Sequence, residues 1–257
     1  MNPGVAFKRV AILVFAALLL EFCSRIGLVP QVMLPPPSDV IATLLRILTN
    51  PNSLSAIPQP SLDFYGNLGI TLLEVAVSYS IVSSVGLVAG FAIGQVKLLE
   101  EAFEPLIVIA FAIPNVVLYP LILLLLGFGP MSKIAFGVIT GLFPVVSSTI
   151  AGMRQVDRDF IRCARSLGAS NLQLYLKVVF PASAFVVVTG LKQGFSLAVL
   201  GVIAAELISS PSGIGYLLNY EIQLFRTSEA FALVIVVLAL SITGLQVLNW
   251  LEKHLGR

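Results

Sequence analysis

Three ionisable residues lie inside long apolar segments of this 257-residue chain, namely Glu74, Lys192 and Glu206. A charged side chain in the middle of a membrane costs about 3 kcal/mol or more unless it is paired, so such residues commonly mark ion relays, gates or solute paths. Lys192 and Glu206 are separated by about 21 Å along a straight helix. They therefore cannot pair with each other, and each needs a partner on another helix, a backbone carbonyl or water.

Polar side chains in the central apolar segments form a second set of candidates for a solute path. Hydrogen-bonding groups of this kind could line a route through a membrane. The alternative is structural, because Ser and Thr often bond their own helix backbone and Tyr often packs in a core. The candidates are Asn115, Tyr119, Ser147, Ser148, Thr149, Gln193 and Ser196.

Catalytic chemistry is not indicated by the sequence. It contains no G-x-x-x-x-G-K-[ST] phosphate loop, no nucleophile elbow and no H-E-x-x-H metal motif. One His and two widely separated cysteines, Cys23 and Cys163, suggest neither a metal site nor a disulfide. We therefore expect a chain that is not an enzyme, binds no metal or cofactor, and does not itself bind ATP.

The composition places these residues in a membrane protein. Hydrophobic residues make up 58% of the chain and charged residues 11%, against about 25% charged residues in soluble domains. Most of the surface must therefore face something other than water. The net charge of +2 and the lack of a basic tract give no indication of nucleic-acid binding.

Six apolar segments are long enough to span a bilayer as helices, which needs about 20 residues. The first follows Lys8 and Arg9 as in a signal peptide, but no small-x-small cleavage site follows, so we expect an uncleaved span. The chain is predicted to be an all-α integral membrane protein whose residues 1–257 form one transmembrane domain. The expected spans are 10–28, 68–95, 104–127, 132–153, 183–208 and 229–251.

Local signals add detail to these spans. Gly86, Gly90 and Gly94 recur every four residues, which predicts a face for close helix packing. Glu21 and Arg25 have the i, i+4 spacing of an ion pair. Ser38 follows a proline turn and is predicted to cap a short helix.

Local breaks are expected at three prolines in the third and fourth spans. A proline removes one backbone hydrogen bond from a helix. In a membrane this is tolerated where neighbouring helices or water satisfy the freed groups. The three prolines are Pro114, Pro120 and Pro144.

The distribution of Lys and Arg predicts the orientation. With the N-terminus in the cytoplasm, ten of these residues fall on the cytoplasmic side and four on the other side, as the positive-inside rule requires. The cytoplasmic set is Lys8, Arg9, Lys97, Arg154, Arg158, Arg162, Arg165, Lys177, Lys253 and Arg257, and the opposite set is Arg25, Arg46, Lys133 and Arg226.

The cytoplasmic loop 156–181 is the longest stretch with a water-facing pattern. Arg158, Arg162 and Arg165 follow one another at i, i+4 and i+7 and share one face of a short helix. Apolar residues occupy the other face: Phe160, Ile161, Ala164 and Leu167.

A second helix is expected to follow a tight turn in the same loop. Gly168 can adopt the left-handed conformation that ends a helix. Ser170 and Gln173 have the spacing of a capping box, and Pro181 ends the second helix. The loop is therefore predicted to be a rigid helix–turn–helix between two spans.

This loop resembles the motif of permease subunits in binding-protein-dependent ABC importers: EAA, three residues, Gly, nine residues, I-x-L-P. Cys163 and Ala164 stand at the two alanines, Gly168 at the glycine and Pro181 at the proline, whereas Arg162 replaces the motif's Glu. Val178 and Phe180 stand at the Ile and Leu positions, and ARSLGAS (164–170) closely resembles the corresponding segment of family members.

Further elements resemble the nitrate, sulfonate and taurine branch of that family. SGIGYL (212–217) is similar to its S-G-L-G-[WY] element, and LPPPSDV (34–40) is similar to a P-x-P-S segment before an interfacial helix. DRDF (157–160) and AEL (205–207) also resemble the family, so the resemblance covers about 34–251.

The resemblance implies a type I importer permease fold with about six helices, and it identifies the loop as a coupling helix that docks on an ATPase subunit. Family members often have a basic residue at Lys192, Glu at Glu206 and Arg at Glu74, so Glu74 is the more particular of the three. The implied coupling residues are Asp157, Arg158, Arg162, Cys163, Ala164, Arg165, Ser166, Leu167, Gly168, Ala169, Ser170 and Pro181, and the candidates for a path or gate are Glu74, Asn115, Tyr119, Lys192, Gln193, Ser196 and Glu206.

The implied partners are two ATP-binding subunits that carry ATP and Mg²⁺, a second permease subunit, identical or paralogous, and an extracytoplasmic solute-binding protein. The implied location is a bacterial or archaeal plasma membrane, with both termini in the cytoplasm. The implied solute is small: nitrate, a sulfonate or taurine, or a vitamin precursor.

Two other classes of function compete with this one. A stand-alone ion-coupled secondary transporter or channel could use Glu74, Lys192 and Glu206 as an ion relay, but it would have no need of the loop at this spacing. A membrane-embedded enzyme would need an acid–base or metal constellation, and the sequence shows none.

Overall fold

The structure is a computed structural model that describes residues 12, 15, 18–27, 30, 32–50, 54 and 62–255. Part of the predicted span 10–28 lies outside the described residues, and residues 18–25 are helical. The described part is built from helices and contains no strand, which confirms the predicted all-α class.

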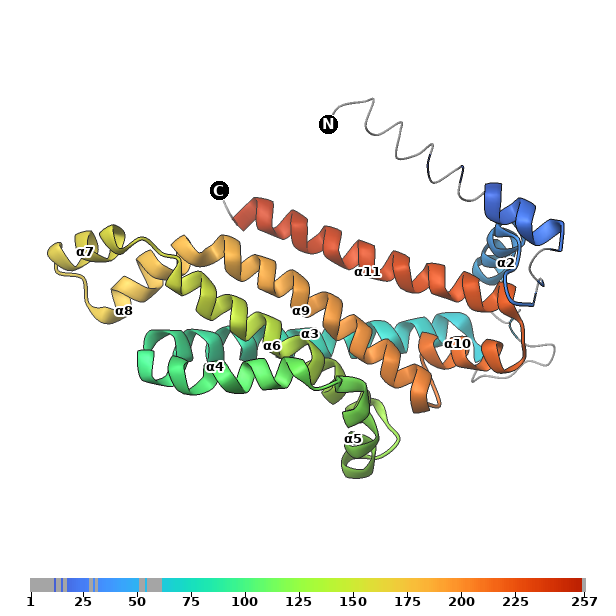
Figure 1. Ribbon diagram of the computed structural model, residues 1–257, viewed down its shortest axis with the longest axis horizontal. Coiled ribbons are helices and arrows are strands. Elements are labelled where there is room, and N and C mark those ends of the chain that lie inside the picture. Colours follow the sequence, from blue (N-terminus) through green and yellow to red (C-terminus); the bar gives the residue numbers. More distant parts are fainter. Residues whose placement is uncertain are drawn as a thin grey trace. The chain divides into compact units, whose positions relative to one another are not determined.

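The chain divides into two compact units, which are described separately. The first comprises 1–70 and 210–239, and the second comprises 71–209 and 240–257. Helices α3 (Phe64–Gln95) and α11 (Thr227–Leu255) each begin in the first unit and end in the second (Figure 1).

In the first unit, α2 (Pro37–Thr49) and α10 (Ile214–Gln223) are the complete helices. The predicted Glu21–Arg25 ion pair is confirmed at 2.6 Å, Oε1 to Nε. The prediction that Ser38 caps α2 is wrong, because Ser38 lies inside the helix. Instead, the Glu21 carboxylate accepts hydrogen bonds from the Ser38 amide and hydroxyl, so a side chain from another segment satisfies the start of α2.

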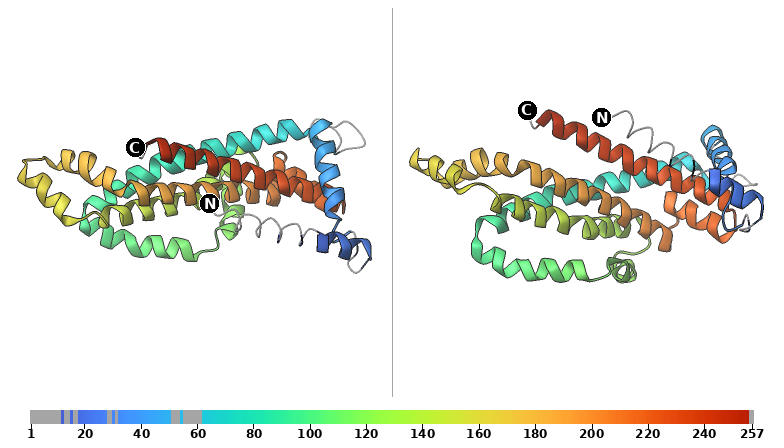
Figure 2. Two further views of the ribbon diagram at one scale, coloured as in Figure 1. Left: turned by 90° about the horizontal axis from the view of Figure 1, so that it is seen from above. Right: turned by 45° about the horizontal axis from the view of Figure 1, so that its top comes forward.

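The second unit centres on α6 (Pro130–Arg154) and α9 (Phe180–Ser209), which lie side by side in Figures 1 and 2. Small residues permit this contact. A Cβ on Gly141 of α6 would come within 2.7 Å of the Gly194 carbonyl oxygen of α9, and one on Gly201 would come within 2.3 Å of Thr140 Oγ1. Helices approach this closely only where a side chain is missing.

The glycine face of α3 packs on α6, as predicted from the four-residue repeat. A Cβ added to Gly86, Gly90 or Gly94 would lie within 3 Å of a side-chain atom of Val145, Thr149 or Met153, respectively. The repeat therefore matches three successive turns of α6, and the prediction of close helix packing is confirmed.

The region predicted as the third span, 104–127, is divided among three elements. They are α4 (Lys97–Ala112), the 3₁₀ turn η2 (Asn115–Leu118) and α5 (Tyr119–Leu126), with α5 leaving α4 at a sharp angle in Figure 1. Pro114 precedes η2 and Pro120 lies in the first turn of α5, so the break falls where two prolines lack an amide donor. Pro144, by contrast, stays inside α6.

Four helical stretches among the described residues are long and apolar enough to cross a membrane: Phe64–Gln95, Pro130–Arg154, Asn171–Ser209 and Thr227–Trp250. Asn115–Leu126 is a shorter apolar stretch.

Candidate functional site

The loop after α6 folds as a capped helix, a glycine turn and a second capped helix. Asp157 caps α7 (Arg158–Ser166) by accepting a hydrogen bond from the Asp159 amide at 2.9 Å. Gly168 has φ +79°, the left-handed conformation that favours glycine. The Gly168 amide bonds Arg165 O and the Ala169 amide bonds Ala164 O, which completes a Schellman motif.

The second half of the loop is continuous with α9. Ser170 and Gln173 form the predicted capping box at the start of α8 (Asn171–Leu174). A π-helical turn, η3 (Tyr175–Val179), then joins α8 to α9, so helical backbone runs from Asn171 to Ser209. A displacement of the loop would therefore be transmitted along α9.

The loop has one packed face and one exposed face. Ile161 and Ala164 of α7 pack against a buried cluster that comprises Met153, Val156, Leu174 and Val179. The other two residues of the expected apolar face point away from it, because Phe160 and Leu167 are exposed, the latter by 83%. Leu172 of α8 is exposed as well.

The three arginines are also exposed on this loop, and Arg162 pairs with Asp159 at 3.3 Å, Nη1 to Oδ1. The helices α7 and α8 project from one end of the second unit in Figures 1 and 2. Apolar and cationic side chains together at such a projection are suited to binding another protein.

Two of the three predicted intramembrane charges meet in a buried cluster. Glu74 of α3 pairs with Lys133 of α6 at 2.5 Å, Oε1 to Nζ. The Glu206 carboxylate of α9 lies next to that of Glu74 and accepts a hydrogen bond from the Thr71 hydroxyl at 2.7 Å. Lys133, Glu74 and Glu206 are at most 2% exposed, so the cluster joins three helices in the interior.

The sequence did not indicate Lys133 as the partner of Glu74, since counting charges placed Lys133 on the outer side of the membrane. The feature of the sequence that could have revealed this pair is that Lys133 lies within the predicted span 132–153.

Lys192 pairs with Glu252 of α11 at 2.5 Å, Nζ to Oε2. Glu252 was not predicted as a site residue. The feature of the sequence that could have revealed it is an acidic residue directly after the predicted final span 229–251, on the side where α9 begins. Both side chains are about one quarter exposed, at 25% and 28%. This pair is therefore accessible, in contrast to the Glu74–Lys133 pair.

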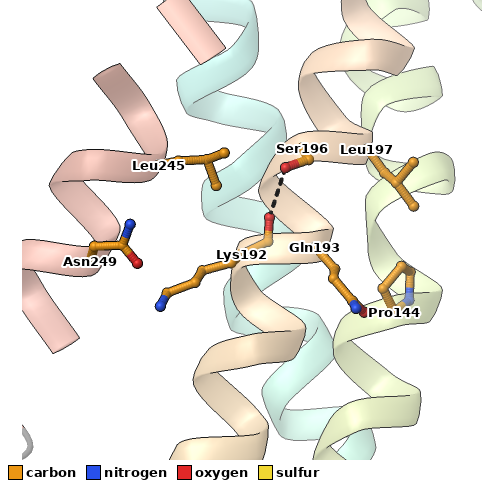
Figure 3. Close-up of a pocket in the computed structure, with 7 residues that line it drawn as sticks. All are labelled: Pro144, Lys192, Gln193, Ser196, Leu197, Leu245 and Asn249. Carbon is orange, nitrogen blue, oxygen red and sulfur yellow. Dashed lines mark hydrogen bonds between the residues drawn. The ribbon is translucent and has the colours of Figure 1, made fainter. Parts of the chain in front are cut away.

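Lys192 also lines a groove of about 620 Å³. Figure 3 shows Lys192 reaching from α9 toward α11, and Gln193 pointing to the other side, toward Pro144 of α6. The one hydrogen bond among the residues drawn runs from the Ser196 hydroxyl to the Lys192 carbonyl. The lining residues are Pro144, Lys192, Gln193, Ser196, Leu197, Leu245 and Asn249.

The other polar candidates do not join this groove. Tyr119 is fully buried, packs on Phe136 and donates to Ser209 O at 3.3 Å. Thr149 donates to Val145 O of its own helix, so its hydroxyl has the structural role that was the alternative to lining a path. Asn115 begins η2 and is partly exposed.

Ser147 lines a separate cavity of about 230 Å³ beside Glu100, Glu104 and Arg154. Ser148 packs where Gly190 leaves room for it, because a Cβ on Gly190 would come within 2.3 Å of Ser148 Cβ.

An additional buried carboxyl group lies outside the spans. Glu221 of α10 is fully buried, and its nearest cation is Arg226, with Nη1 at 3.8 Å from Oε2. Arg226 Nη1 also donates to Leu54 O at 3.0 Å. Burial raises the pKa of Glu221 to about 7, against the lowering effect of Arg226.

Comparison with known proteins gives a consistent result. Residues 83–257 match the family model described as binding-protein-dependent transport system inner membrane component. The chain is 28% identical to a putative aliphatic sulfonates transport permease protein of Bacillus subtilis, over 82% of this chain and 72% of that protein. It is 29% identical to a nitrate import permease protein of Synechocystis sp., over 95% and 86% of the two chains. It is 28% identical to a taurine transport system permease protein of Escherichia coli, over 83% and 76%.

Proposed function

The chain belongs to the family of inner membrane components of binding-protein-dependent transport systems and is a permease subunit of an ABC importer, and we propose that loop 156–181 is the element through which ATP hydrolysis drives it. The chain is thus a transport subunit rather than an enzyme. The observation that carries the proposal is the projecting loop, with a packed inner face and exposed Phe160, Leu167 and Leu172.

The loop is suited to transmitting force. Its turn is held by the Schellman motif at Gly168 and its second helix by the capping box at Ser170, so it moves as a unit rather than bending. The helical backbone from Asn171 to Ser209 connects it to Lys192 and Glu206. When two ATPase subunits close on ATP and Mg²⁺, a shift of the loop would tilt α9 and bias the permease between two packings.

In the proposed path, accessible residues contact the solute and buried residues hold the helices together. Lys192, Gln193 and Ser196 line the groove formed by α6, α9 and α11 and would contact solute. Glu74 and Glu206 belong to the buried cluster and would hold α3, α6 and α9 together in one of the two packings. Asn115 and Tyr119 lie at the break between α4 and α5 and would influence the path by fixing the position of that break.

The assembly proposed here contains two permease subunits, identical or paralogous, two ATPase subunits and an extracytoplasmic solute-binding protein. The chain lies in the plasma membrane of a bacterium or archaeon with its termini in the cytoplasm. The relatives named for sulfonates, nitrate and taurine support a small oxyanion or zwitterion as the solute.

Co-purification from the native membrane in mild detergent tests this proposal. The expected result is recovery of an ATP-binding subunit in a 1:1 ratio to permease chains, with ATPase activity. Recovery of the chain alone, active in ATP-free vesicles under an ion gradient, would instead identify a secondary transporter. A Leu167→Glu variant should lose the ATPase subunit, whereas Leu98→Glu, at a similarly exposed leucine of α4 that lies outside the predicted spans, should retain it.

A further inference from the structure

The groove between α6, α9 and α11 combines one cation, neutral hydrogen-bond donors and apolar walls. Lys192 supplies the positive charge, and the amides of Gln193 and Asn249 supply N–H groups (Figure 3). The apolar part of the lining is formed by Pro144, Leu197 and Leu245. Few precisely placed polar groups in an otherwise apolar lining are typical of a small-molecule site.

The ammonium group of Lys192 can exchange one anionic partner for another. Its partner Glu252 holds it in an accessible ion pair, with each side chain about one quarter exposed. A partly exposed pair leaves room for another charged group to approach the ammonium. An anion that enters the groove could therefore take the place of the Glu252 carboxylate on Lys192.

The pair also lies between two cavities that share the α9 and α11 surfaces. Lys192 lines the 620 Å³ groove, and Glu252 lines a second cavity of about 420 Å³. The second cavity lies against the N-terminal end of α9, where Pro181, Phe185 and Val188 face Glu252 and Lys253. The Lys192–Glu252 pair is thus a contact between the lining of one space and the lining of the other.

We propose that the groove binds a small organic monoanion, with an oxyanion head on Lys192 and a short apolar part against Leu197 and Leu245, and that this anion opens the α9–α11 contact by displacing Glu252. The inference rests on the proposed importer function, since it names the solute class of the same path. A planar or tetrahedral oxyanion has acceptors for the Lys192 ammonium and for the Asn249 amide at once, and both groups lie on the α11 side of the groove (Figure 3).

Thiol modification at Ser196 tests the proposal without knowledge of the natural solute. Ser196 is exposed in the groove and tolerates replacement by cysteine, since its hydroxyl bonds only the Lys192 carbonyl of its own helix. The background carries Cys23→Ser and Cys163→Ala, and the protein is the full chain in native membrane vesicles. The reagents are 2-sulfonatoethyl and 2-(trimethylammonium)ethyl methanethiosulfonate, which have similar sizes and opposite charges.

The measured quantity is the ratio of the two modification rates at Ser196→Cys. The anionic reagent should react faster, and Lys192→Gln should lower the ratio about tenfold, because the local field on the charged reagent is removed. Glu252→Gln should raise the ratio severalfold, since Lys192 is then free. Lys192→Arg should keep the ratio high, and Lys253→Gln, one residue beyond Glu252, should leave it unchanged.

Protection gives a second measurement on the same chains. Millimolar ethanesulfonate should slow the labelling of Ser196→Cys by severalfold, choline should not, and Lys192→Gln should abolish the protection. An unchanged rate ratio in Lys192→Gln, or equal protection by ethanesulfonate and choline, would overturn the proposal. This failure is distinct from failure of the importer function, which shows itself as the absence of an ATPase subunit in the co-purified complex.

Discussion

Lys133 and Glu74 lie 2.5 Å apart, Nζ to Oε1, with exposed side-chain fractions of 2% and 1%. The contact joins α6 to α3 next to Glu206 of α9. Two charges that are both withdrawn from water depend on each other, because removal of either leaves the other buried and uncompensated.

Lys133→Met should therefore destabilise the folded chain by about 3–5 kcal/mol, since the Glu74 carboxylate loses its counter-charge. The double variant Lys133→Met with Glu74→Leu should recover part of that loss, because the Glu74 carboxylate is removed together with its counter-charge and only Glu206 of the cluster remains ionisable. Thermal unfolding of the detergent-solubilised complex measures both effects. Lys97→Met is the matched control, since Lys97 pairs with Glu101 at the surface, and it should change stability by less than about 1 kcal/mol.

Gly168→Val should uncouple ATP hydrolysis from transport. A Cβ at Gly168 meets no atom within 4 Å, so the whole effect comes from forcing a β-branched residue into φ +79°, at about 1–2 kcal/mol. The measurement is solute uptake per ATP hydrolysed in proteoliposomes that contain the complete importer. Gly69→Val is the control, because its Cβ also meets open space but its backbone is ordinary helix. Normal uptake per ATP in Gly168→Val would contradict the coupling role.

Gly141→Ala should disrupt the contact between α6 and α9. The new methyl group would lie 2.7 Å from the Gly194 carbonyl oxygen, and a backbone atom cannot move aside as a flexible side chain can. The expected loss is about 1–3 kcal/mol of stability. Gly69→Ala adds the same methyl group to open space and should lower the melting temperature far less. Equal melting temperatures for the two variants would refute the close packing.

Glu221 should make the stability of the first unit depend on pH. Its folded-state pKa of about 7 lies above the ordinary value of 4.5, so the folded protein retains a proton that the unfolded chain releases. Between these two values, stability falls as pH rises, and it levels off above about pH 7, for a total of about 3 kcal/mol. The nearby charges are Arg226, Glu229 and Arg46.

Hydrogen exchange of α10, corrected for the intrinsic effect of pH, measures this dependence. Glu221→Gln keeps the shape of the side chain without the ionisation and should give a flat profile between pH 4.5 and 7. Glu229→Gln, at a more accessible carboxyl group, should retain most of the decrease in stability with rising pH. A slope that persists in Glu221→Gln would assign it to another group.

Local features of the loop could be read from the sequence because local rules decide them. The capping box at Ser170, the left-handed glycine at Gly168 and the cap at Asp157 all lie within a few residues of the groups they satisfy. The exposure of Phe160 and Leu167 could not be read in the same way. Periodicity assigns them to the apolar face, but of that face only Ile161 and Ala164 pack against the buried cluster beneath α7.

The sequence alone determined that the chain is helical and membrane-spanning, and that it carries the importer loop, since long apolar segments and a motif with fixed spacing are properties of continuous stretches of chain. Tertiary structure decided which charges meet. Lys192 of α9 pairs with Glu252 of α11, 60 residues away, and Glu74 of α3 pairs with Lys133 of α6. These partners depend on which helices are adjacent and in what register they pack, and glycine contacts such as Gly141 on Gly194 set that register. The pairs Lys192–Glu252 and Glu74–Lys133 therefore became visible only in the tertiary structure.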